Sequence, residues 1–173
     1  MFTWHHGFWL YFFTRHHPRV WQFLLGSMLP DYIYLVTISV MLLRGQLSWS
    51  DLLNMNPTIM MSLLPMYPWA VKIDLIGHSI VVWGIAFVLT LLPAIKVLQA
   101  FIIGWGTHLL IDTLTHAAYA NYLFYPISLV SIHSPLSYWE PQFFAYEFKW
   151  VNRIGMIMAV LYLSYEWWKK KNK

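Results

Sequence analysis

GWGTHLLIDTLTH, residues 104–116, is the stretch that decides how this chain folds and what it can bind. It places His108, Asp112 and His116 inside an otherwise apolar run. A charged side chain near the middle of a bilayer costs about 2.5–3.5 kcal/mol on insertion scales, so it normally faces protein or a bound ion. A helix turns by about 100° per residue, so the three residues share one stripe. The spacing predicts that His108 and Asp112 can reach a common metal ion.

The composition indicates an integral membrane protein. Of 173 residues, 59% are hydrophobic and 10% are charged, whereas soluble domains carry about 25% charged residues. The net charge of +4 comes from basic residues at the ends of apolar segments, which favours contact with lipid and excludes a nucleic-acid surface. Cysteine is absent, so any metal must be held by His, Asp, Glu or water.

We therefore expect an all-α fold: an integral membrane helical bundle of about four to five transmembrane helices, forming one domain over residues 1–173. About 20 apolar residues are needed for a span. Met1–Thr14 is too short for this and is interpreted as a short or re-entrant helix packed on the bundle. The long connections are Ser48–Pro68, interpreted as an interfacial helix and loop, and the aromatic-rich Ala117–Lys149, interpreted as an interfacial loop. The predicted spans are Val20–Leu43, Lys72–Leu92, Ala94–Thr115 and Trp150–Trp168.

Basic residues set the predicted orientation. The tail that carries Lys169, Lys170, Lys171 and Lys173 indicates a cytoplasmic C-terminus, because cytoplasmic segments are enriched in Lys and Arg. Counting spans backwards places the two long connections on the opposite side of the membrane.

Further acidic and histidine residues occur in or beside the predicted spans. Asp31 follows Pro30, which removes a backbone donor and bends the helix to make room for a ligand. Asp74 and His78 repeat the four-residue spacing, and one pocket can collect them with His108 and Asp112. One of His5 and His6 is expected to face this pocket. For His116 and Asp74 a purely structural role, as hydrogen-bonded groups between helices, is left open.

These motifs resemble the bacterial membrane-bound metal-dependent hydrolases, which include inner-membrane hydrolases under LexA control. The likeness extends over residues 1–128. It implies that Asp31, His78, His108 and Asp112 are metal ligands, completed by an N-terminal histidine, and that the protein lies in the bacterial inner membrane. The ligand pattern of that family is also similar to zinc-dependent phospholipase C sites, which gather more than one zinc. The motifs that carry the likeness are His5/His6, Leu29-Pro30-Asp31, Gly77-His78-Ser79, the segment 107–116 and Tyr125-Pro126-Ile127.

The sequence predicts a membrane-embedded hydrolase that uses a metal-activated water on a phosphoester or ester of a lipid or lipid-linked substrate. One or two ions are expected, with Zn²⁺ favoured over Mn²⁺. Asp31 or Asp74 is the predicted catalytic base if it does not bind metal. A proton or metal-ion transporter, or an accessory subunit with a structural metal, is the alternative. The bilayer and its lipids are the expected partners, and both a homo-oligomer and a membrane partner protein are left open.

Overall fold

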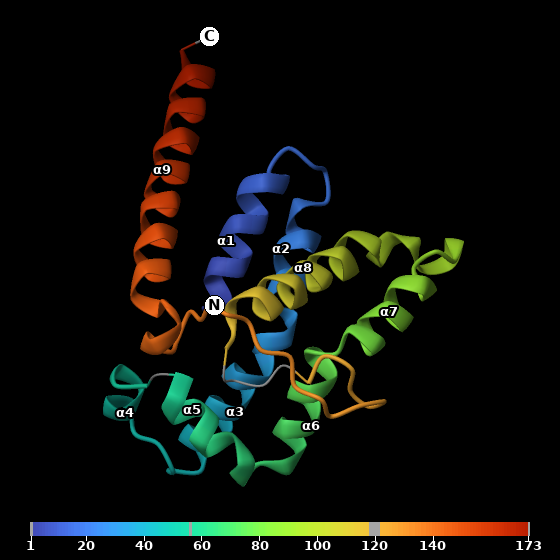
Figure 1. The fold of residues 1–173 in the computed structure, drawn as a ribbon. Helices are drawn as coiled ribbons and strands as arrows, with labels where there is room; N and C mark the ends of the chain where they lie inside the picture. The colour runs from blue at the N-terminus through green and yellow to red at the C-terminus, as the bar shows by residue number, and fades with distance from the viewer. Residues whose placement is uncertain (1, 56, 118–121, 173) are drawn as a thin grey trace.

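The computed structural model describes residues 2–55, 57–117 and 122–172, which are helical and irregular and contain no β-strand. The all-α prediction is thus confirmed for these residues. In the view of Figure 1, α1, α2 and α9 lie in the upper part of the molecule and α3 to α6 in the lower part. Helices α8 and α7 run obliquely on the right. The α-helices, in chain order, are α1 (Thr3–Thr14), α2 (Val20–Met28), α3 (Tyr32–Leu43), α4 (Trp49–Leu53), α5 (Pro57–Leu63), α6 (Pro68–Gly77), α7 (Ile80–Leu89), α8 (Gln99–Thr115) and α9 (Ala145–Lys171).

Two helices of the described residues are long and apolar enough to cross a membrane. They cover Val20–Leu43 and Pro93–Thr115, close to two of the predicted spans. A third crossing would require Ile59–Met66 and Pro68–Gly77, which are bent by 118°, to act as one span. The structure therefore supports two candidate spans, and the expected four to five stay a prediction.

The first candidate span is interrupted where the sequence predicts a bend. A 3-10 turn, η1 (Leu29–Asp31), joins α2 to α3. Pro30 has no N–H to donate to the preceding turn, which explains why regular α-helix stops here. The turn places the Asp31 side chain in the interior, where it is 6% exposed.

The predicted continuous span Lys72–Leu92 is wrong. The helix ends at Gly77, and a new helix begins at Ile80. Ser79 has an extended backbone, and its hydroxyl accepts hydrogen bonds from the N–H groups of Val81 and Val82. A serine in this position satisfies donors that a helix start otherwise leaves unpaired. Because of this break, His78 lies outside regular helix, between α6 and α7.

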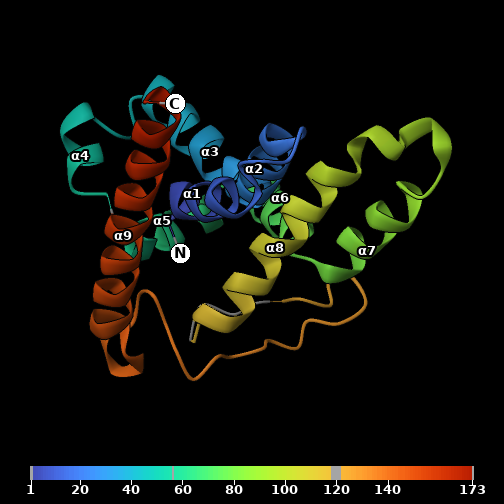
Figure 2. The ribbon, with the colours of Figure 1, turned by 90° about the horizontal axis from the view of Figure 1, so that it is seen from above.

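The remaining expected segments are distributed as follows. Within the predicted segment Met1–Thr14, residues Thr3–Thr14 form the short helix α1, which lies beside α2 in both views (Figures 1 and 2). The predicted span Trp150–Trp168 lies within the longer α9, and Ser48–Pro68 contains two short helices. The described part of Ala117–Lys149 is mostly irregular. Its location at a membrane surface stays a prediction.

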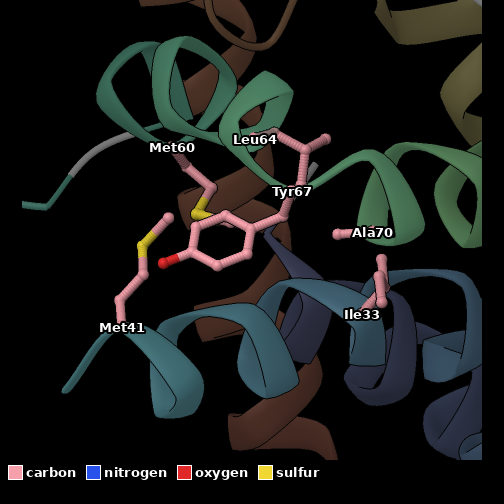
Figure 3. Close-up of a cluster of buried hydrophobic side chains, with 6 residues drawn as sticks. All are labelled: Ile33, Met41, Met60, Leu64, Tyr67 and Ala70. Atoms are coloured by element: carbon pink, nitrogen blue, oxygen red, sulfur yellow. The ribbon is translucent and has the colours of Figure 1, made fainter. Parts of the chain in front are cut away.

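Two groups of buried apolar side chains hold the helices around the interior. One lies between α3 and the α5–α6 region, where the ring of Tyr67 is sandwiched between neighbouring side chains (Figure 3). The other, formed by Ile102, Trp105 and Leu109, packs α8 against α7. The members of the first cluster are Ile33, Met41, Met60, Leu64, Tyr67 and Ala70.

Helices α2 and α8 approach each other so closely that glycine is required at the crossing. A Cβ added to Gly26 would lie within 3.0 Å of the Phe101 backbone, and one added to Gly104 would lie equally close to the Phe23 carbonyl. Real Cβ atoms essentially never show such separations. The two glycines thus permit a contact that any side chain would prevent, and this contact brings His108 of α8 against α2.

Candidate metal centre

Four side chains from three parts of the chain converge at one point. Asp31 ends η1, His78 follows α6 directly, and His108 and Asp112 lie one turn apart on α8. One ligand atom from each residue lies within 4.8 Å of the corresponding atom of the other three. The group is buried, except that the side chain of His78 is 15% exposed. Residues so arranged can hold one cation.

Asp112 lies at the centre of this arrangement and presents its two oxygens to different histidines. Its Oδ2 is 3.0 Å from Nε2 of His108 and 3.9 Å from Nε2 of His78. Its Oδ1 is 3.2 Å from Nε2 of His6 and 3.7 Å from Nε2 of His116. The carboxylate therefore separates two pairs of histidines.

Backbone contacts fix which nitrogen of His108 is available to a cation. Its Nδ1 lies 2.7 Å from the carbonyl oxygen of Ser27. A carbonyl can only accept, so Nδ1 must carry the proton and donate. The Nε2 lone pair is then left to face Asp112 and Asp31, the latter at 3.7 Å.

His78 is oriented in the same way, by Asp74. Its Nδ1 lies 3.1 Å from the Asp74 carboxylate and 3.0 Å from the Asp74 backbone oxygen. Its Nε2 points to the opposite side, 3.8 Å from Asp31. The hydroxyl of Tyr34 donates to the Asp74 carboxylate at 2.6 Å. Asp74 therefore contacts the ring nitrogen of His78 that faces away from the other acidic residues.

The structure separates the two N-terminal histidines. His6 faces Asp112 and stacks on the ring of His108, with the centroids 4.0 Å apart. His5 instead contacts the hydroxyl of Tyr138 at 3.0 Å and the side-chain nitrogen of Asn152 at 3.4 Å.

His116 lies just beyond the end of α8, where the backbone is extended rather than helical. Its ring still approaches Asp112. Burial lowers the pKa of the His116 ring to about 4, so the ring is neutral at pH 7. A neutral imidazole is the form that binds metal.

The residues present fit a cation. Nε2 of His6 and Nε2 of His108 are buried and have no hydrogen-bond partner among the residues that the structure describes, and the same holds for Nδ1 of His6. Buried polar atoms are normally satisfied, and such exceptions call for an ion or an unseen ligand. Buried carboxylates such as Asp31 and Asp112 need positive charge nearby. A set of imidazole and carboxylate ligands suits Zn²⁺.

The model of the family described as "Zinc dependent phospholipase C" matches residues 21–169. The chain belongs to this zinc-dependent phospholipase C family. It is accordingly a metal-dependent hydrolase, and a lipid substrate is consistent with a phospholipase family. No curated protein and no protein of known structure matches the chain.

Within this zinc-dependent family member, two interior groups were not predicted from the sequence. Tyr34 lies three residues after Asp31, so the helical spacing that paired the other residues also brings it to the same face. That spacing was a signal that could have identified it. The Ser27 contact to His108 is made by a backbone carbonyl, and no side-chain pattern reports such a group.

Proposed function

We propose that this chain is a membrane-embedded zinc hydrolase that cleaves a phosphoester bond of a phospholipid or lipid-linked substrate. The observation that carries the proposal is the convergence of Asp31, His78, His108 and Asp112 in the interior of a chain from a zinc-dependent phospholipase C family. The two candidate spans support its location in the membrane. The motif resemblance supports the proposal that this is an inner-membrane protein of the LexA-controlled type. The lysines at the end of α9 support a cytoplasmic C-terminus.

We assign the metal ligands in two groups around Asp112. Oδ2 of Asp112, with Asp31, His78 and His108, would hold one ion. Oδ1 faces His6 and His116, and these three groups would hold a second ion. His5 contacts Tyr138 and Asn152 instead, so His6 is the N-terminal histidine that we assign as a ligand.

When bound, zinc supplies Lewis acidity that lowers the pKa of a coordinated water toward about 7 and stabilises negative charge on phosphoryl oxygens. The protein residues orient the reactants. Asp31 presents Oδ1 to the histidines, and we propose its other oxygen as the acceptor of the proton from the attacking water.

The exposed edge of the site indicates where substrate enters. His78 and His116 are 15% and 14% exposed at their side chains, whereas His6 and His108 are 0% exposed. A lipid headgroup therefore reaches the cluster from the side of His78 and His116. The closed side excludes water from the buried histidines, which strengthens electrostatic interactions there.

The test uses the full chain purified in detergent. His108→Ala and Asp112→Ala are each expected to lose bound zinc and the release of phosphorylated headgroup from mixed micelles. The matched control is His17→Ala, because His17 is exposed and lies outside the cluster. Zinc is measured by mass spectrometry of the protein peak, and products are separated as headgroup phosphate or fatty acid.

Three results would contradict the proposal. Retention of stoichiometric zinc by both variants would remove the assigned site. Release of fatty acid without headgroup phosphate would replace phosphoester cleavage by acyl-ester cleavage. Zinc or proton flux through proteoliposomes without any hydrolysis would favour the transporter alternative.

A further inference from the structure

The position of Asp74 relative to His78 carries an inference about how the site is held. Asp74 precedes His78 by one helical turn at the end of α6. Its carboxylate contacts Nδ1 of the ring, while Nε2 of the same ring faces Asp31 and Asp112. The imidazole therefore stands between Asp74 and the other carboxylates.

The carboxylate of Asp74 is itself held from another helix. The Tyr34 hydroxyl on α3 donates to its Oδ1 at 2.6 Å, a short distance typical of a charge-assisted hydrogen bond. The rings of Tyr34 and His78 lie 6.4 Å apart between centroids. Tyr34, Asp74 and His78 thus form a continuous chain of polar contacts from α3 to the metal centre.

Such a chain has a defined physical effect on a histidine ligand. A carboxylate that accepts from one ring nitrogen fixes the tautomer and the ring orientation and makes the other nitrogen a better ligand. The backbone oxygen of Asp74 also accepts from Nδ1. It can fix the tautomer but carries no full negative charge, so the carboxylate is what increases the basicity of the ring.

We propose that Asp74 and Tyr34 are positioning residues that set the zinc affinity of His78, Asp74 directly and Tyr34 through Asp74. The inference rests on the proposed function, since it takes His78 as a zinc ligand. It replaces the expectation that Asp74 acts as the catalytic base, and it gives Tyr34 a role that the sequence did not suggest.

The experiment compares Tyr34→Phe, Asp74→Asn and the double variant in the full chain. Zinc affinity is measured by competition with a chromophoric chelator. Asp74→Asn is expected to weaken zinc binding by about 10–100-fold, and Tyr34→Phe by about tenfold. This is the range found when a residue that hydrogen-bonds to a metal ligand is replaced. Because Tyr34 acts through Asp74, the double variant should match Asp74→Asn to within about twofold.

Matched control variants are available outside the cluster. Tyr32→Phe removes a hydroxyl on α3 that donates to the Leu25 carbonyl instead. Asp51→Asn changes an exposed carboxylate that caps α4. Both controls should bind zinc as the wild type does. A second readout is the visible absorption of the cobalt-substituted protein, which should shift in Asp74→Asn and Tyr34→Phe but not in the controls.

The outcomes separate this inference from the proposed function. If wild type binds zinc and the two test variants bind it equally well with unchanged cobalt spectra, the positioning role is overturned and the zinc site stands. If the affinities fall as expected while no lipid is cleaved, the positioning role is supported and the proposed substrate is wrong. If the effects of the two single variants multiply in the double variant, Tyr34 does not act through Asp74.

Discussion

The imidazole rings of His6 and His108 are stacked, with centroids 4.0 Å apart and planes inclined by 25°. They belong to α1 and α8, and each directs Nε2 toward a different oxygen of Asp112. A cation held between these two rings and the Asp112 carboxylate would satisfy both Nε2 atoms, which are buried.

Replacing His6 is expected to remove one ion and to leave the other. In the proposed two-ion arrangement, His6→Ala should lower bound zinc from about two to about one per chain, because the first group of ligands is intact. His5→Ala is the matched control and should keep the wild-type zinc content, since His5 contacts Tyr138 and Asn152. Equal zinc loss in both variants would contradict the assignment.

The glycines at the α2–α8 crossing should not tolerate a methyl group. Gly26→Ala and Gly104→Ala would each force a Cβ into backbone, and such overpacking destabilises by about 1–3 kcal/mol or more. Gly84→Ala on α7 is the control, because an added Cβ there meets nothing within 4 Å. It should be neutral or stabilising by about 0.5–1 kcal/mol. Thermal unfolding of each variant in detergent, together with a measurement of its bound zinc, checks both expectations.

Ser79 is expected to stabilise the start of α7 rather than to attack substrate. Ser79→Ala removes the acceptor for two backbone N–H groups and should cost about 1 kcal/mol of unfolding free energy. The turnover of the folded fraction should stay close to that of wild type. Ser48→Ala, which removes the cap of α4, is the control for stability. Loss of a nucleophile would lower turnover by several orders of magnitude, and that outcome would exclude a purely structural role.

Asn152 makes a polar contact between α9 and α1. Its side-chain oxygen accepts a 2.8 Å hydrogen bond from the Trp9 indole, and its nitrogen faces His5. Asn152→Ala leaves the indole N–H without that partner and should cost about 1–3 kcal/mol. Asn172→Ala, at the exposed end of α9, should cost little. Limited proteolysis of α9 distinguishes them, and equal cleavage rates would show that Asn152 does not hold the helix.

Sequence reasoning predicted most of the residues that converge, because they obey simple rules. His108 and Asp112 lie one turn apart on a continuous helix, and Pro30 marks the 3-10 turn that interrupts regular α-helix beside Asp31. Periodicity and a single proline were sufficient in these cases, since both act within a few residues.

The features of the fold and of the site that the sequence did not predict depend on contacts between distant segments. The break between α6 and α7 arises at Ser79, whose hydroxyl caps the new helix and also donates to the Tyr125 carbonyl. The hydropathy of the run around it does not signal a break, because hydropathy does not report capping, although glycine and serine at 77 and 79 are residue types that favour a helix end and a helix start. The choice between His5 and His6 likewise depended on how α1 docks, which neighbouring positions in a sequence cannot decide.

The contact at Gly26 and Gly104 determines how the candidate metal centre is assembled. Sliding α8 by one residue along α2 would displace His108 by about 1.5 Å and turn it by about 100°, away from the Ser27 carbonyl. The close backbone contact at the two glycines favours one alignment of α2 and α8. Zinc binding by the protein therefore indicates whether the two helices are packed in that alignment. A zinc affinity measured by chelator titration is therefore also a measure of how well α2 and α8 are packed.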